Sequence, residues 1–384
     1  MKPKHIAFFM TPNYCHISGS LPIVSALVRR GHRVTYAASE LFAQTVTQLG
    51  GEVVARPRLE LEKLTSQPLA PLLDDLTERT LAQVERFYEE NCPDVILYDT
   101  IDFAGRILAH RLNVPAVQTT PHFAMDRVNL HKQIKDPITR NGVLELAREL
   151  DALLAKFGMT GDSIFHRERL NIYPFPEFLQ PGGAGDERLL FAGRCGGERA
   201  VQGNWRRTDS KKNPLVLVTA STTHVHNPDY FKICVAALGG LDLHVVLSVG
   251  ERPQIAEGLS LPDNVEIATR TSHTKILAHA DLLIYQGGSA TSAEAAYYGV
   301  PVVVLSVGSL ELEWLGDNLV DVGLGTHLKG KQPQASELRE AVLGTLANSA
   351  VTRRAAELKR IVRREPGSEE ASNRIEDLLA FASI

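Results

Sequence analysis

Residues 281–301, DLLIYQGGSATSAEAAYYGVP, contain the pattern that decides the fold. A short apolar run at 281–285 is typical of a buried strand, and Gly287 and Gly288 permit a tight turn after it. The following segment, 289–298, has the composition of a helix. The sequence therefore predicts a strand–turn–helix unit of the kind that builds parallel α/β sheets.

The start of this helix has the features of a phosphate site. The first N–H groups of a helix lack intrahelical partners and carry the positive end of the helix dipole. With Ser289 and Thr291 beside them, these groups suit a diphosphate. The same pattern also fits an ordinary α/β unit whose glycines only turn the chain, and this segment alone does not decide between the two interpretations.

Length and composition predict a soluble cytoplasmic protein of two domains. The chain has 384 residues, more than one core usually organises, and its 44% hydrophobic and 22% charged residues are ordinary for globular proteins. The net charge of −4 predicts no binding of nucleic acid, and no apolar run is long enough to predict stable membrane insertion. Four cysteines without C-x-x-C spacing indicate a reducing compartment rather than a disulfide or zinc framework.

Apolar strand candidates alternate with helical stretches along the chain, which predicts parallel sheets covered on both faces. The candidates are 5–10, 32–38, 94–98 and 115–120, followed by 215–219, 244–249, 265–268, 282–285 and 302–305. Between the two series, 195–213 is rich in glycine and charge, and we interpret it as a linker. We expect an α/β fold with domains 1–205 and 206–365, and a last helical segment, 366–384, that packs back on the first domain.

Four stretches carry a resemblance to a known family. They are HIAFFMTPNYCHISGSLPIVSALVRRGHRVTYA from residue 5, DVILYDTIDFAGRILAHRLNVPAV from 94, LPDNVEIATRTSHTKILAHADLLIYQGGSATSAEAAYYGVPVVV from 261, and NRIEDLLA from 373. In these stretches the chain resembles the GT-B glycosyltransferases of the macrolide type, a UDP-glycosyltransferase-like family. The resemblance runs nearly end to end and implies two doubly wound, Rossmann-like domains that face each other across a cleft.

The resemblance also implies an activity in natural product and antibiotic biosynthesis. The family moves a sugar from a UDP- or dTDP-sugar to a hydroxyl of a lipophilic acceptor such as a polyketide or macrolide. The transfer inverts the sugar's anomeric centre and uses no metal or tightly bound cofactor. The expected partners are thus the nucleotide-sugar donor and the small lipophilic acceptor, while the oligomeric state stays open, a homodimer included.

The resemblance places a catalytic pair on His16 and Asp99. In the family, a histidine in the loop after the first strand takes the acceptor's proton, and an aspartate after the fourth strand orients the imidazole. An alcohol is a poor nucleophile at neutral pH, whereas an imidazole with a pKa of about 6.5 and a carboxylate partner accepts its proton. We interpret the neighbouring Cys15 as a replacement for glycine, because residues adjacent in sequence rarely form a thiolate–imidazole pair.

The resemblance also places a donor site in the second domain, with several departures from the family pattern. Gln286 replaces a histidine that binds the diphosphate and brings no charge. Arg270 stands where the family stacks a tryptophan on the nucleobase, and His273 stands where it has a glutamine. Glu294 keeps the position that binds the ribose. The expected donor-site residues are Thr222, Arg270, His273, Gln286, Gly287, Gly288, Ser289, Thr291 and Glu294.

One donor-site feature is missing altogether. The family has an Asp-Gln pair after the next strand that holds the sugar hydroxyls, and here the segment reads SVGSLELEWLGDN. Glu311 and Glu313 are the nearest acidic candidates. The altered donor site leaves a second hypothesis open, in which a GT-B scaffold keeps the His16 and Asp99 base but catalyses another reaction on a natural product. A third is a non-catalytic binding protein.

The acceptor side is expected in the irregular regions of the first domain. His122, Phe123 and Met125, together with Tyr173, are candidates for an apolar wall against a lipophilic acceptor. Aromatic and methionine side chains at such positions also serve as ordinary core residues, and the sequence leaves both interpretations open.

Overall fold

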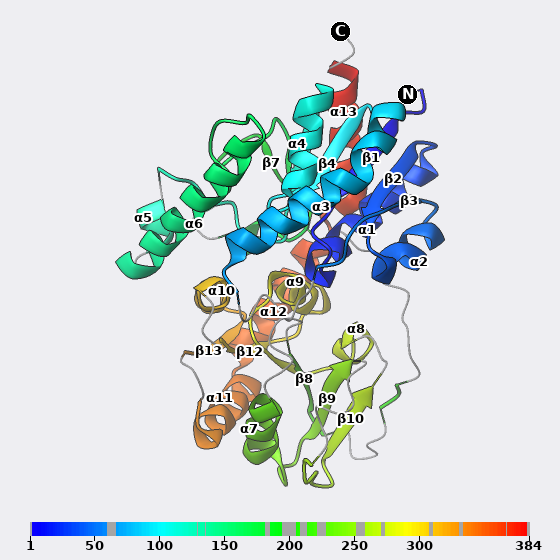
Figure 1. Ribbon diagram of the computed structural model, residues 1–384. Helices are drawn as coiled ribbons and strands as arrows, with labels where there is room; N and C mark the ends of the chain where they lie inside the picture. The colour runs from blue at the N-terminus through cyan, green and yellow to red at the C-terminus, as the bar shows by residue number, and fades with distance from the viewer. Residues whose placement is uncertain are drawn as a thin grey trace. The chain divides into compact units, whose positions relative to one another are not determined.

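Two parallel sheets organise the chain, one in each of two units (Figure 1). The first unit comprises Met1–Gly196 and Pro366–Ile384, and the second comprises Gly197–Glu365. The computed structural model describes residues 2–59, 67–128, 130–134, 136–180, 185–193, 205–207, 213–220, 228–250, 258–269, 273–306, 310–329, 333–365 and 367–381. Most of the predicted linker lies outside these residues, so the domain boundary predicted between 205 and 206 stays a prediction.

The first-unit sheet has the strand order β3-β2-β1-β4-β5-β6-β7 among the described residues, and every pairing is parallel. Its strands are β1 His5–Phe9, β2 Arg33–Ala38, β3 Glu52–Ala55, β4 Val95–Asp99, β5 Ala116–Thr119, β6 Asn171–Tyr173 and β7 Leu189–Phe191. The order reverses between β1 and β4, and ligands of doubly wound folds bind at the carboxyl ends of strands at such a point.

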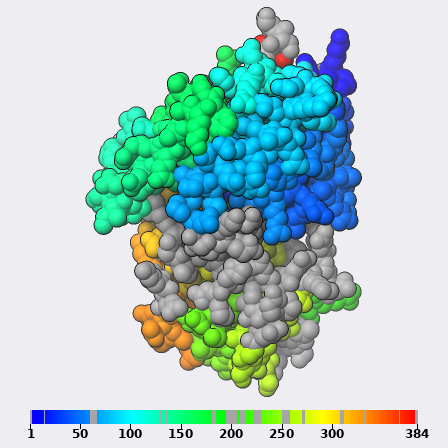
Figure 2. Space-filling view, in the orientation of Figure 1, coloured from blue at the N-terminus to red at the C-terminus, as the bar shows by residue number. Residues whose placement is uncertain are grey.

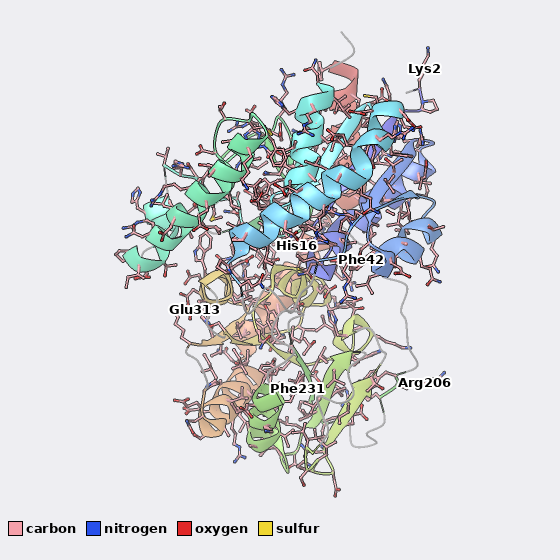
Figure 3. All side chains as sticks on the ribbon, viewed as in Figure 1. Lys2, His16, Phe42, Arg206, Phe231 and Glu313 are labelled. Carbon is pink, nitrogen blue, oxygen red and sulfur yellow. The ribbon has the colours of Figure 1, made fainter. Side chains whose placement is uncertain are left out.

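Helices cover both faces of this sheet. They are α1 Tyr14–Arg29, α2 Glu40–Gln48, α3 Leu69–Glu90, α4 Phe103–Leu112, α5 Leu130–Gln133, α6 Pro137–Lys156 and α13 Gly367–Phe381. Ile6 and Phe8 of β1 point into the core that the sheet forms with α1, α2 and α13. Phe42 lies in the same core (Figure 3). Phe9, on the opposite face of the strand, packs against Tyr88 of α3. Helix α3 contacts both α4 and α6, and these helices form one surface of the unit (Figure 2).

Helix α13 completes the core of the first unit although it comes last in the chain. Its Ile375 and Leu379 are buried in the same cluster as Ile6 and Phe8, and burial of such side chains contributes about 1.5–3 kcal/mol each. At its edge, Arg30, the C-cap residue of α1, pairs with Glu376 at 2.6 Å. The apolar seam therefore holds α13 on the first unit, because partly exposed ion pairs contribute little.

The second-unit sheet has the order β10-β9-β8-β11-β12-β13 among the described residues, again all parallel. Its strands are β8 Leu215–Thr219, β9 His244–Gly250, β10 Val265–Thr269, β11 Leu282–Tyr285, β12 Val302–Leu305 and β13 Gly325–Leu328. Its helices are α7 Pro228–Leu238, α8 His273–Leu277, α9 Ser289–Tyr298, α10 Leu310–Asp321, α11 Ala335–Ala347 and α12 Ser349–Val362. Phe231 lies in its core (Figure 3).

The strands predicted from the sequence are present within one or two residues of their expected bounds. Four strands, β3, β6, β7 and β13, were not predicted. Each has only three or four residues and lies at or next to the edge of its sheet. Each of these segments pairs with the strand before it, whose edge offers backbone N–H and C=O groups. The short, mixed sequence of the segment does not by itself indicate a strand.

Substitution Ile375→Ala tests the seam between α13 and the rest of the first unit. Truncating this buried side chain should lower the free energy of unfolding by about 2–5 kcal/mol, measured by urea denaturation. The matched control is Ile138→Ala, because Ile138 is 83% exposed and its truncation should change stability by less than about 0.5 kcal/mol. Equal effects of the two substitutions would contradict the packing of α13 described above.

Candidate active site

His16 and Asp99 meet at the carboxyl edge of the first-unit sheet. Strands β1 and β4 are parallel neighbours, so the segments that follow them emerge side by side. Nδ1 of His16 lies 2.6 Å from Oδ2 of Asp99, and both side chains are buried. His16 was expected in a loop, but α1 begins two residues earlier, at Tyr14, and places it in the first helical turn (Figure 3). The two predicted catalytic residues are therefore hydrogen-bonded.

The second carboxylate oxygen of Asp99 also has partners. Its Oδ1 accepts the hydroxyl of Thr11 at 3.2 Å and the backbone N–H of Ile101 at 3.0 Å. A carboxylate that accepts several hydrogen bonds is stabilised in its charged form and is fixed in orientation. The imidazole of His16 thus faces a rigid acceptor.

Two further features hold the ends of β1 and α4 together near this pair. A Cβ on Gly105 would lie 2.5 Å from the Cβ of Phe9, so α4 approaches β1 this closely only without a side chain there. Arg56 forms a buried ion pair with Asp102 and donates to the carbonyl of Met10 at 3.2 Å. The sequence does not predict this ion pair, because its partners are far apart in the chain and neither belongs to a local motif.

The charges of the pair reinforce each other. Burial alone would lower the pKa of His16, but the negative charge of Asp99 and the hydrogen bond to it raise this pKa well above 6.5. Burial would raise the pKa of Asp99, whereas the positive charge of His16 and the shared hydrogen bond lower it. The carboxylate of Asp99 therefore stabilises the protonated imidazole and raises the affinity of His16 for a proton.

Two further ionisable residues, His122 and Cys15, lie near the imidazole or next to it in the chain. The ring of His122 lies edge-on to that of His16, with 4.9 Å between the ring centroids. Cys15 is half-buried, and although burial opposes ionisation, the positive charges of His16 and His122 lower the pKa of its thiol. The interpretation of Cys15 as a replacement for glycine stays a prediction. His122, expected in an apolar wall, contacts the imidazole.

The other predicted acceptor residues lie in different surroundings. Phe123 is only 5% exposed and packs edge-to-face on Phe175, which also contacts Tyr173. Met125 is half-buried, and its carbonyl accepts a hydrogen bond from Arg167. Phe123 and Tyr173 thus belong to an aromatic core cluster, and contacts of Phe123 and Met125 with an acceptor stay predictions.

The predicted turn after β11 has the expected form. Gly287 has φ of +99°, and a Cβ there would lie 3.0 Å from the carbonyl oxygen of Leu312, so only glycine fits without strain. Gly288 is the N-cap residue of α9, and Ser289 is its first residue. Gln286, just before the turn, is buried. The first N–H groups of α9 and the side chain of Ser289 therefore lie together at the carboxyl end of β11.

His273 and Glu294, which were expected to contact different parts of a nucleotide, are paired with each other. Nε2 of His273 in α8 lies 2.6 Å from Oε2 of Glu294 in α9. Glu294 is buried, while His273 is partly exposed. Thr291 is half-buried in the first turn of α9. Thr222 and Arg270 lie outside the described residues.

A polar network stands in the region where the family has its Asp-Gln pair. Oγ of Ser306, after β12, lies 2.7 Å from Nε2 of His327, and Nδ1 of His327 lies 2.9 Å from Oδ1 of Asp317 in α10. Gly316 makes room for the imidazole, since a Cβ there would lie 2.7 Å from it. The sequence does not predict this network, because β13 has no clear strand pattern and no other pattern links His327 to β12.

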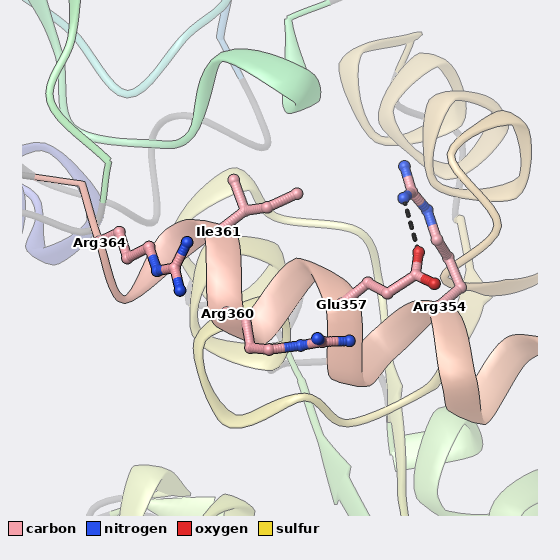
Figure 4. A pocket seen from close by; sticks show the side chains of 5 residues that line it. All are labelled: Arg354, Glu357, Arg360, Ile361 and Arg364. Atoms are coloured by element: carbon pink, nitrogen blue, oxygen red, sulfur yellow. Dashed lines mark hydrogen bonds and ion pairs between the residues drawn. The ribbon is translucent and has the colours of Figure 1, made fainter.

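The described residues show no metal site and no membrane-spanning helix, and the surface depression described below is lined by none of the predicted site residues. Within the described ranges, no three histidine, cysteine, aspartate or glutamate side chains are grouped so as to hold a metal ion. Within the same ranges, no helix has the length and hydrophobicity needed to cross a membrane. A surface depression on α12 contains no predicted site residue (Figure 4). Its lining residues are Arg354, Glu357, Arg360, Ile361 and Arg364.

Known proteins match the chain over nearly its whole length. The family described as Erythromycin biosynthesis protein CIII-like, C-terminal domain, matches residues 232–378. The NDP-glycosyltransferase YjiC of Bacillus subtilis (strain 168) is 29% identical and covers 100% of both chains. The oleandomycin glycosyltransferase of Streptomyces antibioticus is 29% identical over 97% of this chain and 90% of that protein.

Solved structures give the same result. The glycotransferase of kitacinnamycin has a TM-score of 0.84 and 28% identity, covering 98% of this chain and 99% of that chain. The calicheamicin glycosyltransferase CalG4 has a TM-score of 0.80 and 29% identity, covering 99% of each chain. Two parallel α/β units with these likenesses define a glycosyltransferase of the GT-B fold. The resemblance to macrolide-type glycosyltransferases that the sequence predicted is confirmed by these similarities.

Substitution Asp99→Asn tests the electrostatic coupling of the pair. Removal of the carboxylate charge removes the main stabilisation of the imidazolium, so the pKa of His16 should fall by about 1–3 units. This pKa is measured by NMR titration of protein labelled at histidine. The control Asp75→Asn makes the same change at an exposed carboxylate paired with Arg79, and should leave His16 unaffected. An unchanged pKa in Asp99→Asn would refute the coupling.

Proposed function

We propose that this glycosyltransferase moves a sugar from a UDP- or dTDP-sugar to a hydroxyl of a lipophilic natural product, with His16 as the general base. The observation that carries the proposal is the buried hydrogen bond between His16 and Asp99. Relatives support the substrate class. One is the oleandomycin glycosyltransferase, and another is the demethyllactenocin mycarosyltransferase of Streptomyces fradiae, 27% identical over 99% of this chain.

The geometry of the pair sets which atom of His16 takes the proton. Nδ1 faces Asp99, so Nε2 is the nitrogen that accepts the proton of the acceptor hydroxyl. As the proton leaves, the acceptor oxygen attacks the anomeric carbon from the side opposite the diphosphate, and the bond from that carbon to the diphosphate oxygen breaks. The nucleoside diphosphate departs and the anomeric centre is inverted. Asp99 stabilises the imidazolium that results.

The start of α9 is the proposed binding place of the diphosphate. Its first backbone N–H groups and the hydroxyl of Ser289 are hydrogen-bond donors, and its dipole favours negative charge. Gln286 adds a neutral amide where the family has a histidine, so the expected affinity depends mainly on backbone dipoles. The paired His273 and Glu294 are proposed to contact the nucleoside as one hydrogen-bonded unit.

Substitution His16→Ala should lower turnover by about 10²- to 10⁴-fold without loss of the fold. Turnover is measured as release of UDP or dTDP from sugar donors with a panel of macrolide acceptors, and the fold by circular dichroism. Because the pKa of His16 is raised, kcat/KM of the unmodified enzyme should increase with pH beyond pH 6.5. The control His110→Ala alters an exposed histidine and should have no effect. Near-normal turnover of His16→Ala would remove this base from the mechanism.

The donor site is tested by two opposite substitutions. Ser289→Glu places a negative charge at the start of α9 and should weaken the binding of UDP or dTDP at least tenfold in calorimetric titration. Gln286→His adds a group that can be charged beside the diphosphate, and should keep affinity or raise it by about 1–2 kcal/mol.

Ser349→Glu is the matched control, because Ser349 is the exposed first residue of α12 and lies in the same helical position. It should leave nucleotide affinity unchanged. Full activity of nucleotide-free protein without any sugar donor would instead show that the scaffold catalyses another reaction.

A further inference from the structure

Asn13, just before α1, has a buried amide oxygen that the protein does not use. It is the N-cap residue of this helix and is only 4% exposed. Its side chain makes no capping hydrogen bond, and within the described ranges its Oδ1 has no hydrogen-bond partner. A buried carbonyl oxygen without a partner destabilises a protein, because it loses water and gains no hydrogen bond in return. Such atoms are rare in folded proteins, so this one needs a physical reason.

Another asparagine in the same helical position forms the usual hydrogen bonds. Asn348 is the N-cap residue of α12, and its Oδ1 accepts two backbone N–H groups of the first turn, at 3.0 Å and 3.4 Å. Asp102 and Asp136 likewise cap α4 and α6 through their carboxylates. This is the ordinary function of asparagine and aspartate at a helix start. Asn13 therefore has the residue type and the position for capping, but its oxygen does not cap the helix.

The backbone of Asn13 is fixed beside the His16–Asp99 pair. Its N–H donates to the carbonyl of Thr11 at 2.6 Å, and its carbonyl accepts the N–H of His16 at 3.1 Å. The hydroxyl of Thr11 in turn donates to Asp99. An N-cap side chain lies beside the first turn of its helix, and His16 is the third residue of that turn. The unpaired oxygen of Asn13 and the imidazole of His16 are therefore neighbours at the start of α1.

We propose that Oδ1 of Asn13 orients the acceptor by accepting a hydrogen bond from a second hydroxyl, next to the hydroxyl that receives the sugar. This inference rests on the proposed function, in which the reacting hydroxyl lies at Nε2 of His16. His16 is 7% exposed and Asn13 4%, so an acceptor that reaches the imidazole comes to the depth of the amide oxygen.

The chemistry of the two side chains sets which acceptors the enzyme prefers. Residues three apart at a helical turn have Cβ atoms about 5–6 Å apart, so their polar ends can meet hydroxyls on neighbouring carbons. An amide oxygen accepts hydrogen bonds but cannot donate them. Asn13 therefore selects acceptors whose second group is a hydroxyl, and disfavours those in which that group is an ether or is missing.

Calorimetric titration with three coumarins tests this preference. Esculetin has two neighbouring hydroxyls, scopoletin has a methoxy group in place of one of them, and umbelliferone lacks that group. The unmodified protein should bind esculetin at least about tenfold more tightly than either of the others, because only esculetin donates to the buried oxygen. In Asn13→Leu the preference should fall to about threefold or less, because leucine offers no acceptor atom.

The stability of the variants separates this function from ordinary capping. Asn13→Leu removes an unpaired polar atom, so its Tm in scanning calorimetry should hold or rise. Asn348→Leu is the matched control, because it removes two capping hydrogen bonds at the same helical position. It should lower Tm by about 1–4 °C and leave the preference among the coumarins unchanged.

The proposal is overturned by any of three results. The unmodified protein does not prefer esculetin, or Asn13→Leu keeps the preference, or Asn13→Leu lowers Tm as Asn348→Leu does. The titrations contain no sugar donor and need no turnover. Their outcome is therefore distinguishable from a failure of the proposed function, which the turnover of His16→Ala reports.

Discussion

The adjacency of β1 and β4 is the constraint on which the site depends. Because the strand order reverses between β1 and β4, no segment from another strand lies between the two chain segments that follow their carboxyl ends. His16 and Asp99 come from these two segments, and the fold brings them together although β2, α2, β3 and α3 lie between them in the chain. Gly105 and the Arg56–Asp102 pair then keep α4 and the end of β1 close enough for the hydrogen bond to form.

The ionisable side chains near the strand ends are arranged differently in the two units. In the first unit, opposite charges are buried together, and each raises or lowers the proton affinity of its neighbour. In the second unit, the described ionisable groups near the ends of the strands are paired among themselves, as His273 is with Glu294 and His327 with Asp317. The start of α9 therefore offers mainly the helix dipole and the hydroxyl of Ser289, and these groups suit a negatively charged ligand.

The sequence predicts much of the fold, because long buried strands and amphipathic helices carry their signal locally. Strand β11, the turn at Gly287 and helix α9 are visible in one continuous segment, and the structure reproduces their bounds. The short edge strands carry little such signal and depend on the strand beside them.

Side-chain partnerships are harder to predict than the elements that carry them. The His16–Asp99 contact was expected only because a family pattern joins two distant motifs. The position of His16 depends on where α1 begins, and a helix that starts at Tyr14 places this residue in a helical turn rather than in a loop. The Ser306–His327–Asp317 network requires a strand that the sequence did not reveal.

The return of α13 to the first unit has a consequence for biosynthesis. During translation, residues 1–196 emerge without the helix that covers Ile6 and Phe8, and the whole second unit is made before Ile375 and Leu379 exist. The second unit is in effect an insertion within the first, and its own core can close as soon as residue 365 is free of the ribosome. The unit that begins synthesis first is therefore the one whose core is completed last.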